Sequence, residues 1–138
     1  MQEKTVLAID PGSSKCGLAI VRREGDAHIS LLWRRIEPRE SLLDAIREGV
    51  YEHPVSLTIV GGGTQSRSVV GEVRSLFPSM GVLVVDEKNT TLEARERYWE
   101  YNPRRGWRRL VPATLQAPPD QVDDFVALIL AERVLLEG

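Results

Sequence analysis

The sequence predicts an α/β protein in which helices cover a mixed sheet. Three short apolar segments follow one another near the start of the chain, with turn-forming residues between them. Later apolar segments alternate with stretches of helical periodicity, which is typical of parallel strands joined by helices. The 138 residues, of which 42% are hydrophobic, suffice for a domain with its own core. We therefore expect residues 1–138 to form a single domain.

The first three expected strands are residues 5–10, 16–21 and 27–33. Pro11 and Gly12 end the first strand, and we expect the second strand to pair with it as a hairpin. The turn-forming run Glu-Gly-Asp at 24–26 separates the second strand from the third.

The remaining elements alternate between helix and strand. The expected order is a helix at 41–51 with Ser41 as its N-cap, a strand at 55–60, a helix at 67–77, a strand at 82–85, a helix at 90–101, a proline-rich loop at 102–119 and a final helix at 120–137 with Asp120 as its N-cap. The helix at 90–101 opens with Thr90 and Glu93, which have the spacing of a capping box.

Composition excludes several classes of protein. The single cysteine, Cys16, excludes an internal disulfide and a zinc site of several cysteines, and we expect it in the core. No apolar stretch approaches the roughly 20 residues that span a bilayer, and no signal-peptide pattern is present. We expect a cytoplasmic protein without membrane contact. The net charge of -2 argues against a small, wholly basic nucleic-acid-binding protein.

Acidic residues gather where the sheet is expected to bind ligands. Asp10 ends the first strand, Glu87 follows the strand at 82–85, and Asp123 and Asp124 lie in the first turn of the final helix. Ligands of such sheets bind outside the carboxyl ends of the parallel strands. Oxygen ligands there suit Mg²⁺ or Mn²⁺, and two such ions can cleave a phosphodiester.

A structural interpretation of the same acids stays open at this point. Asp10 can cap a turn, and Glu87 can be a surface residue. The negative charge of Asp123 can stabilise the N-terminus of the final helix. Helical spacing does not separate Asp123 from Asp124, because both flank the buried side of the helix.

Three segments resemble a known family. Residues 6–20 (VLAIDPGSSKCGLAI) resemble the opening hairpin of the RuvC-like and YqgF-like branch of the ribonuclease H superfamily. Residues 85–94 (VDEKNTTLEA) resemble the YqgF, or RuvX, motif D-E-R-x-[ST]-T-x-E-A, and residues 122–130 (VDDFVALIL) resemble the closing acidic helix. The three segments occur in family order and span nearly the whole chain.

The resemblance implies a ribonuclease H-like fold, with a mixed five-stranded sheet and helices on both faces. It also implies cleavage of phosphodiester bonds with Mg²⁺ or Mn²⁺, because members are described as Holliday-junction-resolvase-like or as nucleases that mature the 5′ end of pre-16S ribosomal RNA. Asp10, Glu87 and Asp123 match the catalytic acids, and Asp124 remains a neighbour that could substitute as a metal ligand. Lys88 stands where the family has an arginine. An arginine guanidinium can bind a phosphate with two parallel hydrogen bonds, whereas a lysine ammonium acts as a single point charge.

Nucleic acid is the expected partner, RNA or DNA. Residues 95–109 hold six Arg, two Glu and four aromatic residues, a combination that suits phosphate neutralisation and base stacking. The alternative is that the aromatic side chains pack within the protein and the arginine side chains are solvated. The loop at 61–67 can contact a phosphate or form a plain turn. The candidate contacts are Ser13, Ser14, Lys15, Thr64, Lys88, Arg104, Arg105, Trp107, Arg108 and Arg109.

Two other functions compete with a nuclease. An ATP-binding domain of the actin and hexokinase type shares the turn after the first strand, but it needs a second lobe that 138 residues cannot supply. A non-catalytic nucleic-acid or ribosome-assembly module would keep the fold without turnover. The sequence leaves the chain a monomer or a homodimer, and a junction resolvase requires two active sites related by symmetry.

Overall fold

A computed structural model of the chain describes residues 4–12, 14–25, 28–63, 65–85 and 123–137. The elements are β1 (Lys4–Asp10), β2 (Lys15–Glu24), β3 (His28–Pro38), a 3-10 turn η1 (Arg39–Ser41), α1 (Leu42–Glu52), β4 (Leu57–Gly61), α2 (Ser66–Leu76), β5 (Gly81–Val85) and α4 (Asp123–Glu137). The expected order of strands and helices is confirmed for these residues. The expected helix at 90–101, the loop at 102–119 and the Asp120 cap lie outside them.

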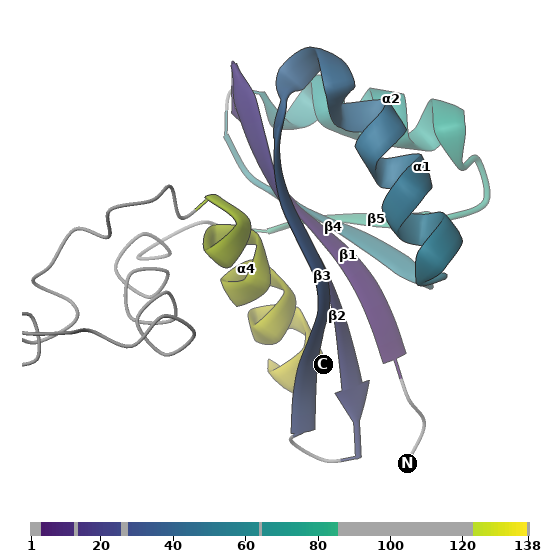
Figure 1. Cartoon of the computed structure of the whole chain (residues 1–138), viewed down its shortest axis with the longest axis vertical. Coiled ribbons are helices and arrows are strands. Elements are labelled where there is room, and N and C mark those ends of the chain that lie inside the picture. Colours follow the sequence, from purple (N-terminus) through teal and green to yellow (C-terminus); the bar gives the residue numbers. More distant parts are fainter. Residues whose placement is uncertain (1–3, 13, 26–27, 64, 86–122, 138) are drawn as a thin grey trace, which may run out of the picture.

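The strands form one mixed five-stranded sheet, as expected. Their spatial order is β3-β2-β1-β4-β5. The first three strands are antiparallel neighbours, whereas β1, β4 and β5 are parallel to one another. Figure 1 shows α1 and α2 on one side of this sheet and α4 on the other. The expectation of helices on both faces is therefore confirmed.

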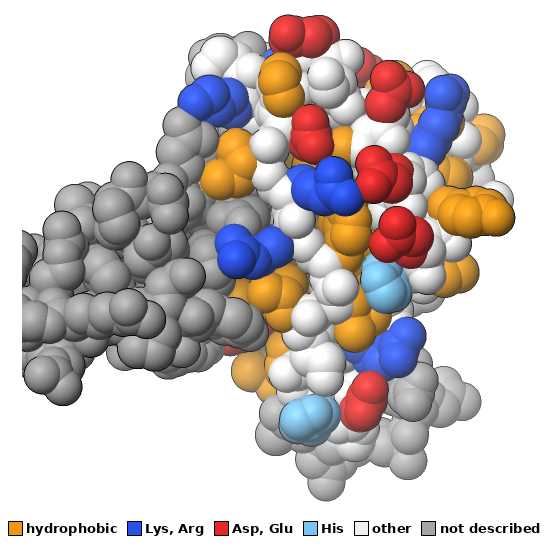
Figure 2. All heavy atoms as spheres, viewed as in Figure 1, with side chains coloured by type: hydrophobic (Ala, Val, Ile, Leu, Met, Phe, Trp, Pro, Cys, Tyr) orange, Lys and Arg blue, Asp and Glu red, His pale blue; other side chains and the backbone are white. Residues whose placement is uncertain are grey.

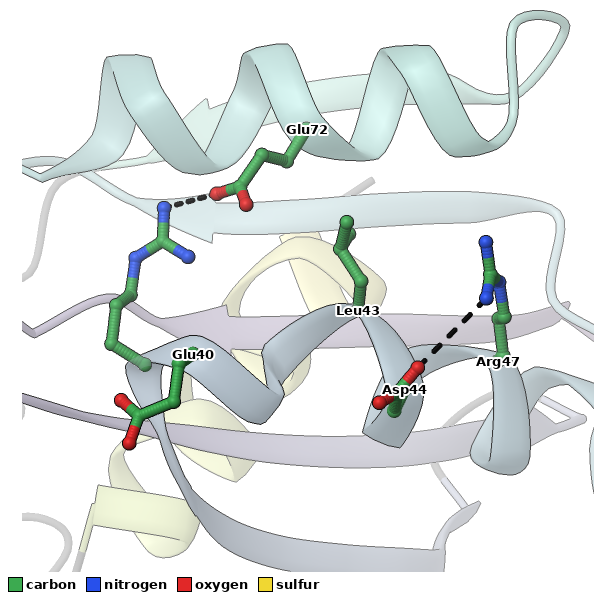
Figure 3. A pocket seen from close by; sticks show the side chains of 6 residues that line it. Glu40, Leu43, Asp44, Arg47 and Glu72 are labelled. Carbon is green, nitrogen blue, oxygen red and sulfur yellow. Dashed lines mark hydrogen bonds and ion pairs between the residues drawn. The ribbon is translucent and has the colours of Figure 1, made fainter.

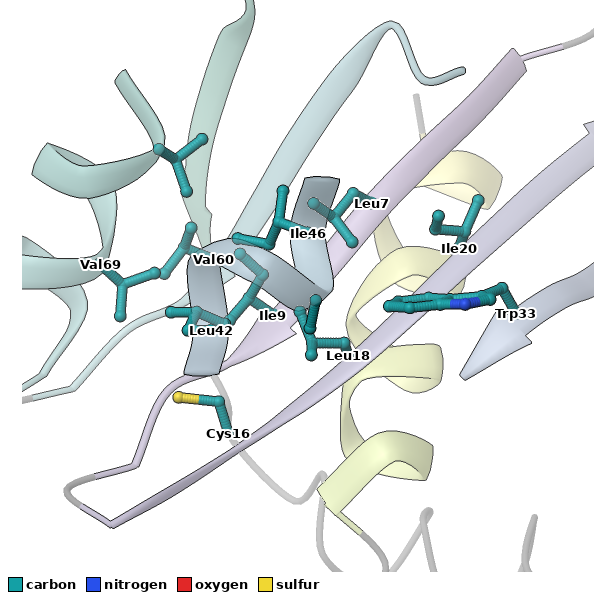
Figure 4. Close-up of a cluster of buried hydrophobic side chains, with 12 residues drawn as sticks. Leu7, Ile9, Cys16, Leu18, Ile20, Trp33, Leu42, Ile46, Val60 and Val69 are labelled. Atoms are coloured by element: carbon teal, nitrogen blue, oxygen red, sulfur yellow. The ribbon is translucent and has the colours of Figure 1, made fainter. Parts of the chain in front are cut away.

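Two buried clusters follow from the alternation of side chains along the strands. On one face, Leu7 and Ile9 of β1 pack with Leu42 and Ile46 of α1 (Figure 4). On the opposite face, the cluster joins strands β1, β2 and β4 to α4 through Val6, Ala8, Ala19, Val21, Ile59, Ala127, Leu130 and Ala131. The sheet is thus the middle layer of three.

The largest difference from expectation is the length of β3. It runs on to Pro38, five residues beyond the expected end at residue 33, and it pairs with β2 throughout. Charged residues such as Arg34 interrupt the apolar pattern, but an outer strand tolerates them because its side chains reach solvent. Leu32 is an extra residue in the pairing with β2, since Ile20 pairs with Trp33 and Val21 with Leu31.

The helices differ from expectation in smaller ways. Ser41 is the residue that precedes α1, as expected, but its hydroxyl makes no capping hydrogen bond. Helix α2 begins at Ser66, one residue earlier than expected, and the strand expected at 55–60 begins at Leu57. Of the helices within the described ranges, none is long and apolar enough to cross a membrane.

Candidate functional site

The carboxyl ends of β1, β4 and β5 share one edge of the sheet. Because these strands are parallel, their register sets which residues lie level. Ile9 pairs with Val60, and Gly61 pairs with Val85. Asp10, Gly61 and Val85 therefore lie side by side at this edge, which we call the carboxyl edge.

Asp10 lies at the carboxyl edge on the face that α4 covers. It is the last residue of β1 and is half-buried. Side chains alternate along a strand, so Asp10 shares its face with Val6 and Ala8, both of which belong to the cluster packed on α4. A carboxylate there is partly shielded from water and partly exposed to it.

The direction of α4 points its first turn toward the same edge. The Arg23 guanidinium donates a hydrogen bond to the backbone oxygen of Leu135, near the end of α4. Arg23 pairs with Lys4 at the start of β1. Helix α4 therefore runs roughly opposite to β1, so its first turn is directed toward the carboxyl edge (Figure 1). Asp123 is the first residue of this helix.

The turn between β1 and β2 carries further candidates. Lys15 and Ser14 are exposed, and Lys15 shares the face of Asp10 by the alternation along β2. A Cβ atom on Gly12 would overlap the backbone oxygen of Lys15, so the turn requires glycine at this position. Cys16 is buried, as expected, with its thiol 4.0 Å from the Gly12 oxygen. Burial raises the pKa of that thiol.

The glycine loop after β4 is tied into the sheet. The N–H of Gly62 donates to the backbone oxygen of Val85 over 2.6 Å, which joins the ends of β4 and β5. The hydroxyl of Ser66 donates to the Gly63 oxygen over 2.8 Å. The Gly62 N–H is therefore used within the protein, which favours the plain-turn interpretation at that residue.

Sequence reasoning missed an ion pair beside the carboxyl edge. The Arg39 guanidinium pairs with Glu72 and donates to the Ser68 hydroxyl over 2.9 Å. Arg39 and Glu72 both line a hollow of about 460 Å³, to which α1 contributes Leu43, Asp44 and Arg47. Figure 3 shows Glu72 reaching into it from α2. The hydrogen bond to Glu72 raises the pKa of Arg39 further above its usual range. No local pattern marks Arg39, because its partners on α2 are distant in the sequence.

Several expected site residues lie outside the described ranges. They are Glu87, Ser13, Thr64, Lys88, Arg104, Arg105, Trp107, Arg108 and Arg109. The backbone positions of Asp123 and Asp124 are described, but the choice between them as the metal ligand stays a prediction. Within the part of the chain that the structure describes, no three Asp, Glu, His or Cys side chains form a group that could hold a metal ion.

The outer surface of α1 is acidic. Glu40, Asp44, Glu48 and Glu52 follow one another at four-residue spacing and are exposed. Glu40 belongs to η1, just before the helix, and the spacing places the other three on one side of α1. Figure 2 shows carboxylates gathered over α1. Such a surface repels the phosphates of nucleic acid.

No family model and no curated protein matches this sequence. Solved structures do match. RuvC of T. thermophilus in complex with a Holliday junction substrate aligns with a TM-score of 0.61 at 16% identity, over 96% of this chain and 93% of that chain. The Fowlpox virus resolvase with its Holliday junction DNA aligns with a TM-score of 0.60 at 11% identity, over 96% of this chain and 99% of that chain.

A second structure of Thermus thermophilus RuvC aligns with a TM-score of 0.58 at 14% identity, over 96% of both chains. Together with the strand order and the helices on both faces, these alignments identify the architecture. The chain has a ribonuclease H-like fold, as the resemblance implied.

Proposed function

We propose that this protein is a divalent-metal-dependent nuclease that hydrolyses phosphodiester bonds of structured or single-stranded nucleic acid. Asp10, Glu87 and Asp123 hold one or two Mg²⁺ or Mn²⁺ ions, with Asp124 as the alternative ligand on the same helix turn. The biological substrate is a branched DNA junction or the 5′ end of precursor 16S ribosomal RNA.

The observation that carries the proposal is that α4 covers the face of the sheet that Asp10 shares and runs with its first turn directed toward the carboxyl edge. Asp10 ends β1, and the bond between Arg23 and Leu135 turns the first residues of α4 toward that end. This direction supports the proposal that two sequence-distant acidic positions serve one site, where ligands of such sheets bind. The similar solved structures include RuvC and a viral resolvase, each in complex with a Holliday junction substrate, which supports a branched substrate.

The residues at the edge fit a hard cation. Asp10 supplies carboxylate oxygen, the ligand type that Mg²⁺ and Mn²⁺ prefer, and its half-buried position retains access to solvent. Glu87 follows Val85 by two residues in the sequence, and Val85 lies level with Asp10 across the sheet. Such an ion, when bound, supplies charge stabilisation at the phosphate and activates water.

The protein's own groups position the nucleic acid in this proposal. Lys15 shares the face of Asp10, so its ammonium attracts the backbone phosphates toward the carboxylate. On the opposite face of the sheet, carboxylates gather over α1, and those that Arg35 and Arg47 do not neutralise disfavour the same phosphates. Together these charges favour approach of the strand from the side of α4.

The first test is cleavage by matched carboxylate variants. We expect wild-type protein with Mn²⁺ to cut a labelled four-way DNA junction, and we expect Asp10→Asn to lose about 100-fold or more in rate. Asp44→Asn is the control, because Asp44 is an exposed carboxylate, 87% exposed, on α1. Single-stranded DNA and a precursor ribosomal RNA 5′-end fragment, assayed in parallel, identify the substrate class.

Two further outcomes of this test are informative. Asp123→Asn and Asp124→Asn, compared in the same assay, identify the ligand on α4: we expect Asp123→Asn to abolish cleavage and Asp124→Asn to retain it. Binding of every substrate without cleavage would contradict the nuclease and favour a non-catalytic module. Equal loss in Asp44→Asn and Asp10→Asn would show that the effect is not specific to the carboxyl edge.

A further inference from the structure

We propose that Arg39 is a positioning residue for this site: it holds the β1–β2 turn, which joins Asp10 to Lys15, against α2. The effect on cleavage rests on the proposed function above. The effect on the turn rests only on contacts between described residues, so the two can be tested separately.

The backbone of Arg39 holds one side of the turn. Arg39 follows Pro38, the last residue of β3, and Pro38 pairs with Lys15 at the start of β2. The N–H of Arg39 donates to the backbone oxygen of Ser14 over 2.8 Å. Any shift of the junction between β3 and α1 is therefore transmitted to the residue before Lys15.

The side chain of Arg39 ties this junction to α2. Its guanidinium pairs with Glu72 and donates to the Ser68 hydroxyl, both on α2. The Arg39 side chain is only 18% exposed, so solvent screens this pair less than it screens pairs on the open surface. Arg39 thus connects three chain segments: its backbone N–H holds the β1–β2 turn, its own position lies in the junction after β3, and its guanidinium binds α2.

Arg39 acts on the opposite face of the sheet from the candidate acids. Its partners belong to α2, which covers the face of Leu7 and Ile9, whereas Asp10 shares the face of α4. The guanidinium is also already paired with the Glu72 carboxylate. Both observations favour an indirect role over direct contact with a phosphate. A displacement of about 1 Å in a reacting group can lower a rate by about 100-fold.

Cys16 reports on the turn without any assay of activity. It is the single cysteine of the chain, it is buried, and its thiol faces the Gly12 oxygen within the turn. A thiol reagent can react with such a buried group only when local unfolding exposes it to solvent. The rate of Cys16 labelling therefore measures how firmly the turn is held.

The experiment compares Arg39→Ala, Arg39→Lys and Glu72→Gln with wild-type protein. Arg47→Ala is the matched control, because Arg47 lines the same hollow and pairs with Asp44 over 3.8 Å, but is 62% exposed. We expect Cys16 of the Arg39→Ala variant to react about tenfold faster with Ellman's reagent, since local opening governs access to the thiol.

The kinetic readout is cleavage of the four-way junction, for which we expect Arg39→Ala to lower kcat about tenfold with little change in KM. Glu72→Gln should also raise the rate of Cys16 labelling and lower kcat. Arg39→Lys should show smaller changes in both quantities than Arg39→Ala, and Arg47→Ala should match wild-type protein.

Each alternative outcome is distinguishable. Unchanged labelling in Arg39→Ala would overturn the proposal, as would faster labelling with unchanged kcat well below the unfolding temperature. A raised KM with unchanged kcat, absent from Glu72→Gln, would overturn it in favour of direct phosphate contact. If wild-type protein cuts no substrate, the proposed function fails, and Cys16 labelling still decides whether Arg39 holds the turn.

Discussion

At the scale of single residues, Gly12 determines the shape of the turn beside Asp10. A Cβ atom at Gly12 would overlap the backbone oxygen of Lys15, and backbone atoms cannot move away as a flexible side chain can. Gly71, in the middle of α2, has open space around the corresponding Cβ position. The two glycines therefore differ in what a methyl group would meet.

We predict opposite effects of alanine at these two glycines. Gly12→Ala should lower the free energy of unfolding by about 1–3 kcal/mol, because the turn must move to admit the methyl group. Gly71→Ala should raise it by about 1 kcal/mol, because alanine favours a helix interior over glycine. Urea denaturation measures both values. Equal and small changes would show that the turn accommodates a side chain at residue 12.

The candidate residues could be predicted from the sequence to different extents. Asp10 could be located because a carboxylate directly after an apolar strand and before Pro-Gly marks the end of that strand. Arg39 could not, because Glu72 is 33 residues away along the chain and neither residue lies in a recognisable motif. Local patterns predict where a strand ends, whereas an ion pair between distant segments depends on the completed fold.

At the scale of elements, the β1–β2 hairpin presents a lysine at each end. Lys15 begins β2 beside the carboxyl edge, and Lys4 begins β1 at the opposite edge, where it pairs with Arg23. Both lysines are exposed. They differ in their distance from Asp10, so they form a matched pair for mapping where nucleic acid binds.

We predict that Lys15→Gln weakens binding to a four-way junction and that Lys4→Gln does not. Loss of one phosphate contact should reduce the slope of log affinity against log salt by about 1. Fluorescence anisotropy across a salt series, with a chelator present to prevent cleavage, measures this slope. Equal weakening by the two substitutions would contradict binding at the carboxyl edge.

The length of β3 shows where sequence patterns are least informative about an element. Its second half contains Arg34, Arg35 and Glu37, which interrupt the apolar run and so favour an early end. In the structure, Arg35 lies over the ring of Trp33 and pairs with Glu48 of α1. Pairing with β2 thus continues through a segment whose own composition would end the strand.

At the scale of the whole molecule, bound metal should stabilise the fold. A ligand that binds only the native state raises stability by about 2.7 kcal/mol at 100 times its dissociation constant. We predict that Mn²⁺ or Mg²⁺ raises the unfolding temperature of wild-type protein and of Asp44→Asn, and that a chelator reverses the rise. Asp10→Asn should show no rise in calorimetry. A rise of equal size in Asp10→Asn would place the metal elsewhere.

The helices that cover the two faces of the sheet are synthesised at different times. The face of Leu7 and Ile9 packs on α1 and α2, which precede residue 77, whereas the face of Val6 and Ala8 packs on α4, which begins at Asp123. A growing chain therefore carries an apolar sheet face without α4 until residues 123–137 emerge, and such surfaces favour aggregation. The same helix carries Asp123, the last of the proposed acids. Under the proposed function, a nascent chain that lacks α4 would therefore lack both the cover of this sheet face and one of its metal ligands.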